Sequence, residues 1–267
     1  MLKLIASDLD GTLLTPDKSL PEEIFPVVEK LHERGIIFTP ASGRQLPNLK
    51  ALFAPVIEKI AIIAENGSLC WYGGQIIYTN PTPQNKVRYA LDLVRGVEGL
   101  HPLLCCADCA YYESEFPTFI ARASAAYNSI QKADLNEIAE SKTILKISVW
   151  DEYAPCSEHG GKILQPLVKG LRTVLSGFDW FDISSLTANK GNALTAMLEK
   201  LNVKKEECAA FGDHMNDLEM LEACGAPYVT ANAFAALKEK FKNTVPSNAE
   251  LGVITTLKKN IIGDNVI

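Results

Sequence analysis

The sequence predicts an α/β fold in which helices flank a parallel, Rossmann-like sheet and an inserted α+β domain interrupts the chain. Three short apolar runs begin near residues 2, 36 and 60, carry little charge and end at turn-forming residues, as buried parallel strands do. Segments with helical spacing of apolar residues lie between these runs, and such alternation is typical of a parallel sheet. The alternation stops near residue 80 and returns after residue 182.

The first segment, residues 1–80, is expected to form the first part of the core domain. Its expected elements are, in order, a strand from residue 2, a helix over 21–34, a strand over 36–40, a helix from near Pro47, a strand over 60–64 and a hairpin around Gly73-Gly74. Ser19 and Glu22 fit a capping box for the first helix, and Gly35 fits its end. The first strand runs directly into two aspartates, Asp8 and Asp10.

The second segment, residues 81–182, is predicted to be an inserted domain with an antiparallel sheet. Its expected elements are a helix over 85–97, two strands within 102–112, a helix over 116–127, a strand over 144–150, a helix over 163–171 and two short strands, RTVLS and DWFDISS, that close the region. Pro81 and Pro83 mark the linker into it. Pro166 must lie in the first turn of the helix over 163–171 or bend it.

The third segment, residues 183–267, is expected to complete the core domain. A helix should begin near Lys190, and a strand over 207–211 should lead into Gly212 and Asp213. A helix over 218–224 and two further strand–helix units follow as far as Ile267.

Composition excludes several classes of partner. The net charge is −6 and no long basic run occurs, which argues against nucleic acid as the main partner. No apolar run is long enough to span a bilayer, and the amino terminus has no signal-peptide pattern. We therefore expect a cytoplasmic protein without membrane contact, whose oligomeric state the sequence leaves open.

The seven cysteines are expected to be reduced structural thiols. Cys105, Cys106 and Cys109 lie close together, but the chain offers no second ligand pair at the spacing that zinc sites use. Small, polarisable side chains in a pair of strands explain this cluster better.

Four clusters of polar residues stand at strand ends or helix starts, and phosphoryl transfer explains all four together. They are Asp8 with Asp10, Ser42, Lys190, and Asp213 with Asn216 and Asp217. A carboxylate can act as nucleophile, while Mg²⁺, a lysine and a hydroxyl neutralise the phosphate and a second acid protonates the leaving group. Taken singly, Lys190 suits a solvated helix start, Asp213 or Asp217 suits a helix cap, and His214 is a bystander. The order and context of the clusters carry the prediction.

The motifs DLDGTLL, SGR, KG and GDHMND, in this order, resemble those of the haloacid dehalogenase-like (HAD) superfamily, and in particular its Cof-like phosphatases. The resemblance covers essentially the whole chain, and the long insertion between Ser42 and Lys190 lies where the Cof-like branch has its cap domain. The resemblance implies a magnesium-dependent phosphatase that acts on small phosphorylated metabolites, such as sugar phosphates, through an aspartyl-phosphate. The polar approach SSLTANKG to Lys190 departs from the usual apolar pattern, which leaves the substrate open.

The resemblance also implies roles for individual residues. Asp8 would be the nucleophile and a magnesium ligand, and Asp10 the general acid/base with its backbone carbonyl on the metal. Asp213 would be the third protein ligand of the metal, and Asp217 would support it and Lys190. The residues implied in binding the phosphate or the substrate are Ser42, Gly43, Arg44, Lys190 and Asn216, the last of which would also support the metal ligand.

Three other functions compete with a phosphatase. A phosphosugar mutase would use the same motifs and would require a bisphosphate activator. A receiver-type signalling domain also combines acidic residues, a hydroxyl and a lysine, but is about half as long and lacks a cap. A silent phospho-ligand binding protein is disfavoured because clustered carboxylates destabilise a fold unless they are used.

Overall fold

The computed structural model describes residues 1–263, so the last four residues of the predicted third segment lie outside the described part. The chain divides into two compact units. Unit 1 comprises residues 1–42, 49–78 and 189–267, and unit 2 comprises residues 43–48 and 79–188. No helix among residues 1–263 has the length and apolar character needed to cross a membrane.

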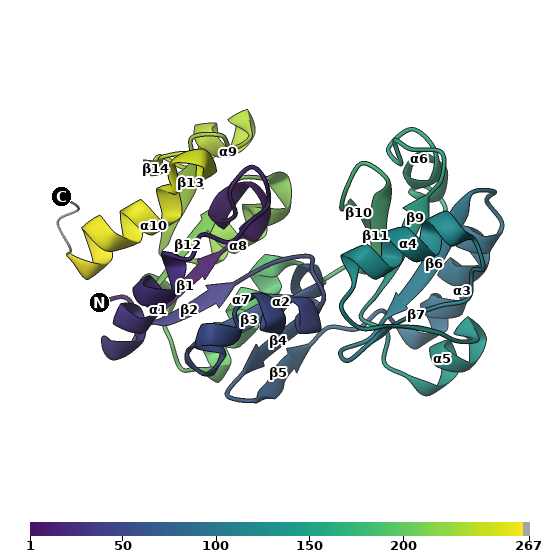
Figure 1. The fold of residues 1–267 in the computed structure, drawn as a ribbon, viewed down its shortest axis with the longest axis horizontal. Helices are drawn as coiled ribbons and strands as arrows, with labels where there is room; N and C mark the ends of the chain where they lie inside the picture. Colours follow the sequence, from purple (N-terminus) through teal and green to yellow (C-terminus); the bar gives the residue numbers. More distant parts are fainter. Residues whose placement is uncertain (264–267) are drawn as a thin grey trace. The chain divides into compact units, whose positions relative to one another are not determined.

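Unit 1 is built on a five-stranded parallel sheet in the order β14-β13-β12-β1-β2 (Figure 1). The strands are β1 (Leu4–Ser7), β2 (Ile37–Pro40), β12 (Cys208–Gly212), β13 (Ala226–Thr230) and β14 (Thr244–Val245). Two isolated parallel bridges, Phe38 to Ile60 and Ala41 to Ile63, join the segment around β2 to the segment around β3 (Ala61–Ala64). Strand β3 also forms a three-stranded sheet with β4 (Leu69–Tyr72) and β5 (Gln75–Thr79). The predicted α/β class with a parallel sheet is therefore confirmed.

Helices flank this sheet. They are α1 (Ile24–Glu33), α2 (Leu46–Leu52), α7 (Lys190–Lys200), α8 (Leu218–Ala223), α9 (Ala235–Lys240) and α10 (Gly252–Thr256). Alternate residues of β1, Leu4 and Ala6, join a hydrophobic cluster with residues of α7, α8 and α9. Because successive strand residues point to opposite faces, Ile5 between them is buried on the other side. The central strands β1 and β12 are thus buried on both faces, as their apolar sequences require.

Unit 2 contains a six-stranded sheet in the order β10-β11-β9-β6-β7-β8. Its strands are β6 (Leu100–Cys105), β7 (Ala110–Tyr112), β8 (Ile130–Lys132), β9 (Lys146–Asp151), β10 (Leu171–Leu175) and β11 (Trp180–Ser185). Neighbouring strands are antiparallel except β7 and β8. The helices are α3 (Gln84–Arg95), α4 (Pro117–Ala126), α5 (Leu135–Ser141) and α6 (Gly160–Leu164).

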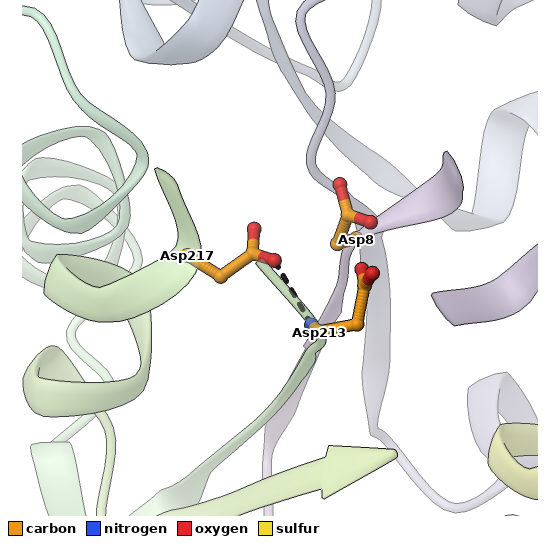
Figure 2. A group of neighbouring side chains, drawn as sticks. All are labelled: Asp8, Asp213 and Asp217. Carbon is orange, nitrogen blue, oxygen red and sulfur yellow. Dashed lines mark hydrogen bonds between the residues drawn. The ribbon is translucent and has the colours of Figure 1, made fainter. Parts of the chain in front are cut away.

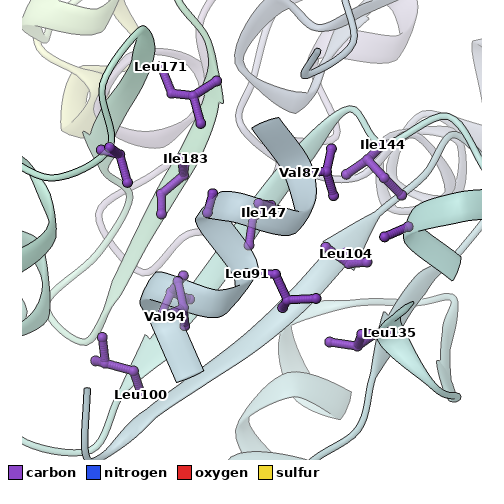
Figure 3. Packing of buried hydrophobic residues seen from close by; sticks show 14 of the residues in the cluster. Val87, Leu91, Val94, Leu100, Leu104, Leu135, Ile144, Ile147, Leu171 and Ile183 are labelled. Atoms are coloured by element: carbon purple, nitrogen blue, oxygen red, sulfur yellow. The ribbon is translucent and has the colours of Figure 1, made fainter. Parts of the chain in front are cut away.

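Unit 2 has its own hydrophobic core on each face of this sheet. Figure 3 shows Val87, Leu91 and Val94 of α3 packed with Leu104 and Ile147 of the sheet. On the opposite face, residues of α4 join a second cluster with strand residues that include Trp150. A segment with two such clusters can be treated as a compact body with its own stability.

Two details of unit 2 differ from the sequence expectation. The helix predicted over 163–171 is instead α6, which ends at Leu164, and Pro166, which lacks an N–H, cannot continue its hydrogen bonding. The short elements β8 and α5 occupy a stretch to which the sequence assigns no element. All seven cysteines are free and buried, as expected for structural thiols.

Candidate active site

Parallel pairing brings the sequence-predicted aspartates together. Ser7 of β1 lies opposite Phe211 of β12, so the residues that follow these strands leave the same edge of the sheet side by side. Figure 2 shows the side chains of Asp8 and Asp213 close together at this edge, with that of Asp217 opposite them. The site thus unites two segments that are far apart in the chain.

A buried lysine connects two of these carboxylates. The Lys190 Nζ donates to Asp8 Oδ1 at 2.5 Å and to Asp217 Oδ1 at 2.7 Å. Lys190 is 1% exposed, and Asp8 and Asp217 are 6% and 0% exposed, so water screens this network little. One lysine cannot balance the charge of the carboxylates around it, which leaves the site electronegative.

The start of α7 determines where Lys190 lies. Lys190 is the first residue of α7, and the side chain of Asn189 caps the helix by accepting from the backbone N of Asn192 at 2.7 Å. Gly191 packs so closely on α8 that an added Cβ would lie 2.3 Å from the carbonyl oxygen of Glu219. The close approach of the two helices buries the lysine beside Asp217.

Asp217 fixes the loop that carries Asp213. Its Oδ2 accepts from the backbone N of Asp213 and of His214, both at 3.1 Å, and the first of these bonds is drawn in Figure 2. Both oxygens of Asp217 are therefore used within the site, one by Lys190 and one by this loop. Asn216 precedes it in the short turn Met215–Asp217 and is half-buried.

Thr12 holds the carboxylate of Asp213, a contact that the sequence analysis did not assign. The Thr12 Oγ1 donates to Asp213 Oδ1 at 2.7 Å. The threonine belongs to the DGT part of the first motif, and only the juxtaposition of β1 and β12 reveals its partner 201 residues away in the chain.

The acidic cluster fits a magnesium ion. Asp8, Asp213 and Asp217 each offer one carboxylate oxygen, and these three oxygens lie within 4.8 Å of one another. Among the Asp, Glu, His and Cys side chains of residues 1–263, these three form the group that could hold a metal ion. Carboxylate oxygens suit Mg²⁺, which also keeps several waters. Lys190 binds one oxygen of Asp8, and Thr12 binds one oxygen of Asp213. Because a carboxylate has two oxygens, each aspartate keeps a second oxygen that can bind the metal.

Burial and neighbouring charges shift the pKa values of the groups in this cluster. Burial is the main cause that raises the pKa of Asp8 well above its ordinary value, and the nearby Asp217 adds to it. Burial also raises the pKa of Asp213. For Lys190, burial alone would lower the pKa, but the charges of Asp217 and Asp8 outweigh it and keep the ammonium protonated.

The remaining predicted residues are placed as follows. Ser42 is buried after β2, where its backbone N donates to Ile63 O at 2.9 Å. Gly43 and Arg44 group with unit 2, in which the Lys146 Nζ donates to Gly43 O at 2.9 Å. Asp10 is exposed and lies in the irregular turn Leu9–Leu13 after β1. The structure therefore brings Asp8, Lys190, Asp213 and Asp217 together within unit 1.

Without metal, the stability that Asp213 contributes should fall as the pH rises. A carboxyl whose pKa is raised in the folded protein stabilises the fold most at pH below its unfolded pKa, and this contribution is lost as pH rises through the folded value. In EDTA, Asp213→Asn should therefore be more stable than wild type near pH 8, and the difference should shrink toward about pH 4. Mg²⁺ should stabilise the wild type more than the variant. Thermal unfolding of both proteins across this range measures the effect, and a difference independent of pH would contradict it.

The chain is similar to several known proteins. A family model described as haloacid dehalogenase-like hydrolase matches residues 5–257. The chain is 28% identical over 240 residues to an HMP-PP phosphatase of Cronobacter sakazakii, covering 89% of this chain and 87% of that protein. A haloacid dehalogenase-like hydrolase from Bacillus subtilis is 24% identical and has a similar fold, with a TM-score of 0.83 over 97% of this chain and 100% of that one. A haloacid dehalogenase-like hydrolase from Bacteroides thetaiotaomicron shares the fold with a TM-score of 0.84 at 22% identity, over 97% of this chain and 99% of that one.

Proposed function

The chain belongs to the haloacid dehalogenase-like hydrolase family, and from that membership we propose that it is a magnesium-dependent phosphatase that hydrolyses small phosphate monoesters through a phosphorylated Asp8. The predicted resemblance to this family is confirmed. The observation that carries the finer proposal is the cluster of Asp8, Asp213 and Asp217 at the carboxyl edge of a parallel sheet, in which buried Lys190 binds Asp8 and Asp217.

Asp8 and Asp213 would hold the metal, with the backbone carbonyl of Asp10 beside them. When bound, Mg²⁺ supplies positive charge that offsets the repulsion between a carboxylate nucleophile and a phosphate dianion. Asp217 has both oxygens committed to Lys190 and to the Asp213 loop, so its proposed role is to position these groups.

The proposed reaction proceeds in two steps on the protein's own residues. An Asp8 oxygen forms a bond to phosphorus while the bond from phosphorus to the ester oxygen breaks, and Asp10 gives its proton to the leaving alkoxide. Asp10 then takes a proton from water, and the water oxygen bonds to the phosphorus of phospho-Asp8 while the bond from phosphorus to the Asp8 oxygen breaks, which releases inorganic phosphate. Both the carboxylate of Asp8 and the acid form of Asp10 are thereby restored.

Lys190 and Ser42 are proposed to bind the phosphoryl oxygens. The carboxylates that hold Lys190 keep it charged, and a buried cation acts strongly on the charge of a transferring phosphoryl group. Ser42 lies two residues after the end of β2, the strand next to β1, so it is at the same edge of the sheet as Asp8. Gly43, Arg44 and Asn216 are proposed to complete the binding of phosphate or substrate.

Unit 2 is proposed to be the cap domain that selects the substrate, with residues 81–182 forming the inserted part. Its separate sheet and its two hydrophobic clusters support a body that can move as a whole. Named relatives include HMP-PP phosphatases, which supports a small phosphorylated metabolite as substrate of this chain.

A phosphatase screen tests this proposal. Purified protein should release phosphate from several sugar, nucleotide or cofactor phosphates when Mg²⁺ is present, and chelation by EDTA should abolish the release. Phosphate release unaffected by EDTA, or none from a broad panel in excess Mg²⁺, would overturn the proposal. A protein that transfers phosphate to a sugar and needs a bisphosphate activator would instead be a phosphosugar mutase.

A further inference from the structure

Two asparagines from the carboxyl-terminal part of unit 1 bind the loop that follows β1. The Asn232 Nδ2 donates to Gly11 O at 2.8 Å, and the Asn248 Nδ2 donates to Leu14 O at 2.8 Å. The two asparagines are joined to each other, because the backbone N of Asn248 donates to Asn232 Oδ1 at 3.1 Å. Both ends of the Asn232 amide are thus engaged, although the residue is exposed.

The turns that carry these asparagines are themselves well held. Asn248 is 9% exposed and begins a short helical turn in which Ser247 and Glu250 cap each other, with Ser247 Oγ donating to Glu250 Oε2 at 2.6 Å. The turn that contains Asn232 also binds the loop that carries Asp213, because the backbone N of Phe234 donates to Asp213 O at 2.9 Å. Asn232 therefore lies in a turn that contacts the loops of both Asp8 and Asp213.

The carbonyl that Asn232 binds belongs to the peptide unit that leads to Thr12. Gly11 has φ +90°, and a Cβ there would lie 2.3 Å from Asp213 Oδ2, so its backbone packs directly on that carboxylate. A peptide unit is planar, so fixing the Gly11 oxygen also fixes the direction in which the chain enters Thr12. The Thr12 hydroxyl in turn holds Asp213 Oδ1 at 2.7 Å.

We propose that Asn232, supported by Asn248, is a positioning residue that sets the orientation of the Gly11–Thr12 peptide and, through Thr12, of the Asp213 carboxylate. This inference rests on the proposed magnesium site. Its consequence is that a side chain outside the acidic cluster determines how well that cluster binds the metal. Removing a residue that binds a metal ligand directly, as Thr12 binds Asp213, typically changes metal affinity or activity by roughly 10–100-fold, and Asn232 acts on that residue.

Three variants separate this role from simple bracing of the fold. Asn232→Ala removes both hydrogen bonds, whereas Asn232→Asp keeps an oxygen to accept from Asn248 N and loses the donor to Gly11 O. Asn243→Ala is the matched control, because Asn243 is also exposed and its Nδ2 donates to a strand carbonyl, that of Pro227, at 3.0 Å. Pro227 lies near the start of β13, away from the carboxyl edge of the sheet.

The first readout is Mg²⁺ binding to the protein without substrate, measured by calorimetry. Asn232→Ala and Asn232→Asp should both weaken it by roughly 10-fold, the lower end of that range, because they act through Thr12. This should hold although the aspartate adds a negative charge that by itself would favour a cation. Asn243→Ala should leave it unchanged, and thermal stability in EDTA should be similar for all three variants. Affinity lost in Asn232→Ala but retained in Asn232→Asp would assign the effect to the bond with Asn248 and overturn the proposal.

The second readout needs no metal. Hydrogen exchange in EDTA should be faster across residues 9–14 in both Asn232 variants, including the amide of Leu14, which donates to Leu9 O at 2.8 Å and closes the turn. Unchanged exchange there would overturn the inference even if the protein hydrolyses phosphate esters. Conversely, wild-type protein that neither binds Mg²⁺ nor releases phosphate would overturn the proposed function, while faster exchange would still show that Asn232 orders the loop.

Discussion

Replacing Asp8 with asparagine should abolish phosphate release in the presence of saturating Mg²⁺. The amide nitrogen and oxygen of asparagine cannot replace a carboxylate as nucleophile, and one negative metal ligand is lost as well. The fold should persist, because the amide oxygen of the new side chain can still accept a hydrogen bond from Lys190. Steady-state phosphate release with circular dichroism as the control for folding measures this, and substantial activity in Asp8→Asn would exclude Asp8 as the nucleophile.

Asp10→Asn should fail in a different way, because it removes proton transfer and keeps the backbone carbonyl. General acid/base catalysis typically contributes about 10²–10⁴-fold in rate. In single-turnover phosphoryl transfer, the loss should be small for aryl phosphates, whose leaving groups need little protonation, and large for alkyl or sugar phosphates. Hydrolysis of the phospho-enzyme should slow for every substrate, because water must be activated each time. Equal losses of the first step across leaving groups would contradict the role of Asp10.

The second large effect is expected for Lys190→Met, in both stability and phosphoryl transfer. Removing one partner of a buried ion pair typically costs about 3–5 kcal/mol, because the remaining charges lie buried without compensation. Here two carboxylates, Asp8 and Asp217, would lose the ammonium that binds both. Transfer to Asp8 should also slow strongly, since Lys190 is proposed to neutralise the phosphoryl oxygens.

A buried ion pair in unit 2 provides the control for that variant. Lys146 and Asp182 lie 3.0 Å apart with side chains 4% and 2% exposed, a burial similar to that of the Lys190 network. Asp182→Ala should therefore destabilise the protein by a comparable amount in urea unfolding. It should retain formation of the phospho-enzyme from an aryl phosphate, because Lys146 can still donate to Gly43 O. If both variants lost phosphoryl transfer in proportion to their lost stability, Lys190 would have a structural role and no direct one.

The strands of unit 1 that lead to Asp8 and Asp213 could be predicted from the sequence. The strands before Asp8 and Asp213 are short apolar runs that end in polar turns, and such runs need burial on both faces of a parallel sheet. The four clusters were predicted together because each stands at a strand end or helix start. What the sequence could not give is the pairing, such as Lys190 between Asp8 and Asp217, since the contact with Asp8 spans 182 residues and depends on strand order.

The unpredicted features have weak local signals. Strand β8 has three half-buried or exposed residues and no alternation to detect, and α5 is one short helix capped by Asp134. The predicted helix over 163–171 followed apolar spacing past Pro166, where the chain cannot keep its hydrogen bonds. Thr12 and Asn232 each donate one side-chain hydrogen bond to a loop that is distant in the chain. A single polar residue in a turn forms no periodic pattern, so the sequence does not reveal such contacts.

The central claim is that Asp8 carries the phosphoryl group, and chemical trapping tests it most directly. Protein mixed with substrate and Mg²⁺ is quenched in acid during turnover, reduced with borohydride, which converts a phosphorylated aspartate to homoserine, and digested for mass spectrometry. The account predicts homoserine at position 8, dependent on Mg²⁺ and absent from Asp8→Asn. Homoserine at the position of another aspartate would contradict the account. So would the absence of homoserine from Asp10→Asn protein that releases phosphate, because the slowed second step of this variant should let phospho-Asp8 accumulate.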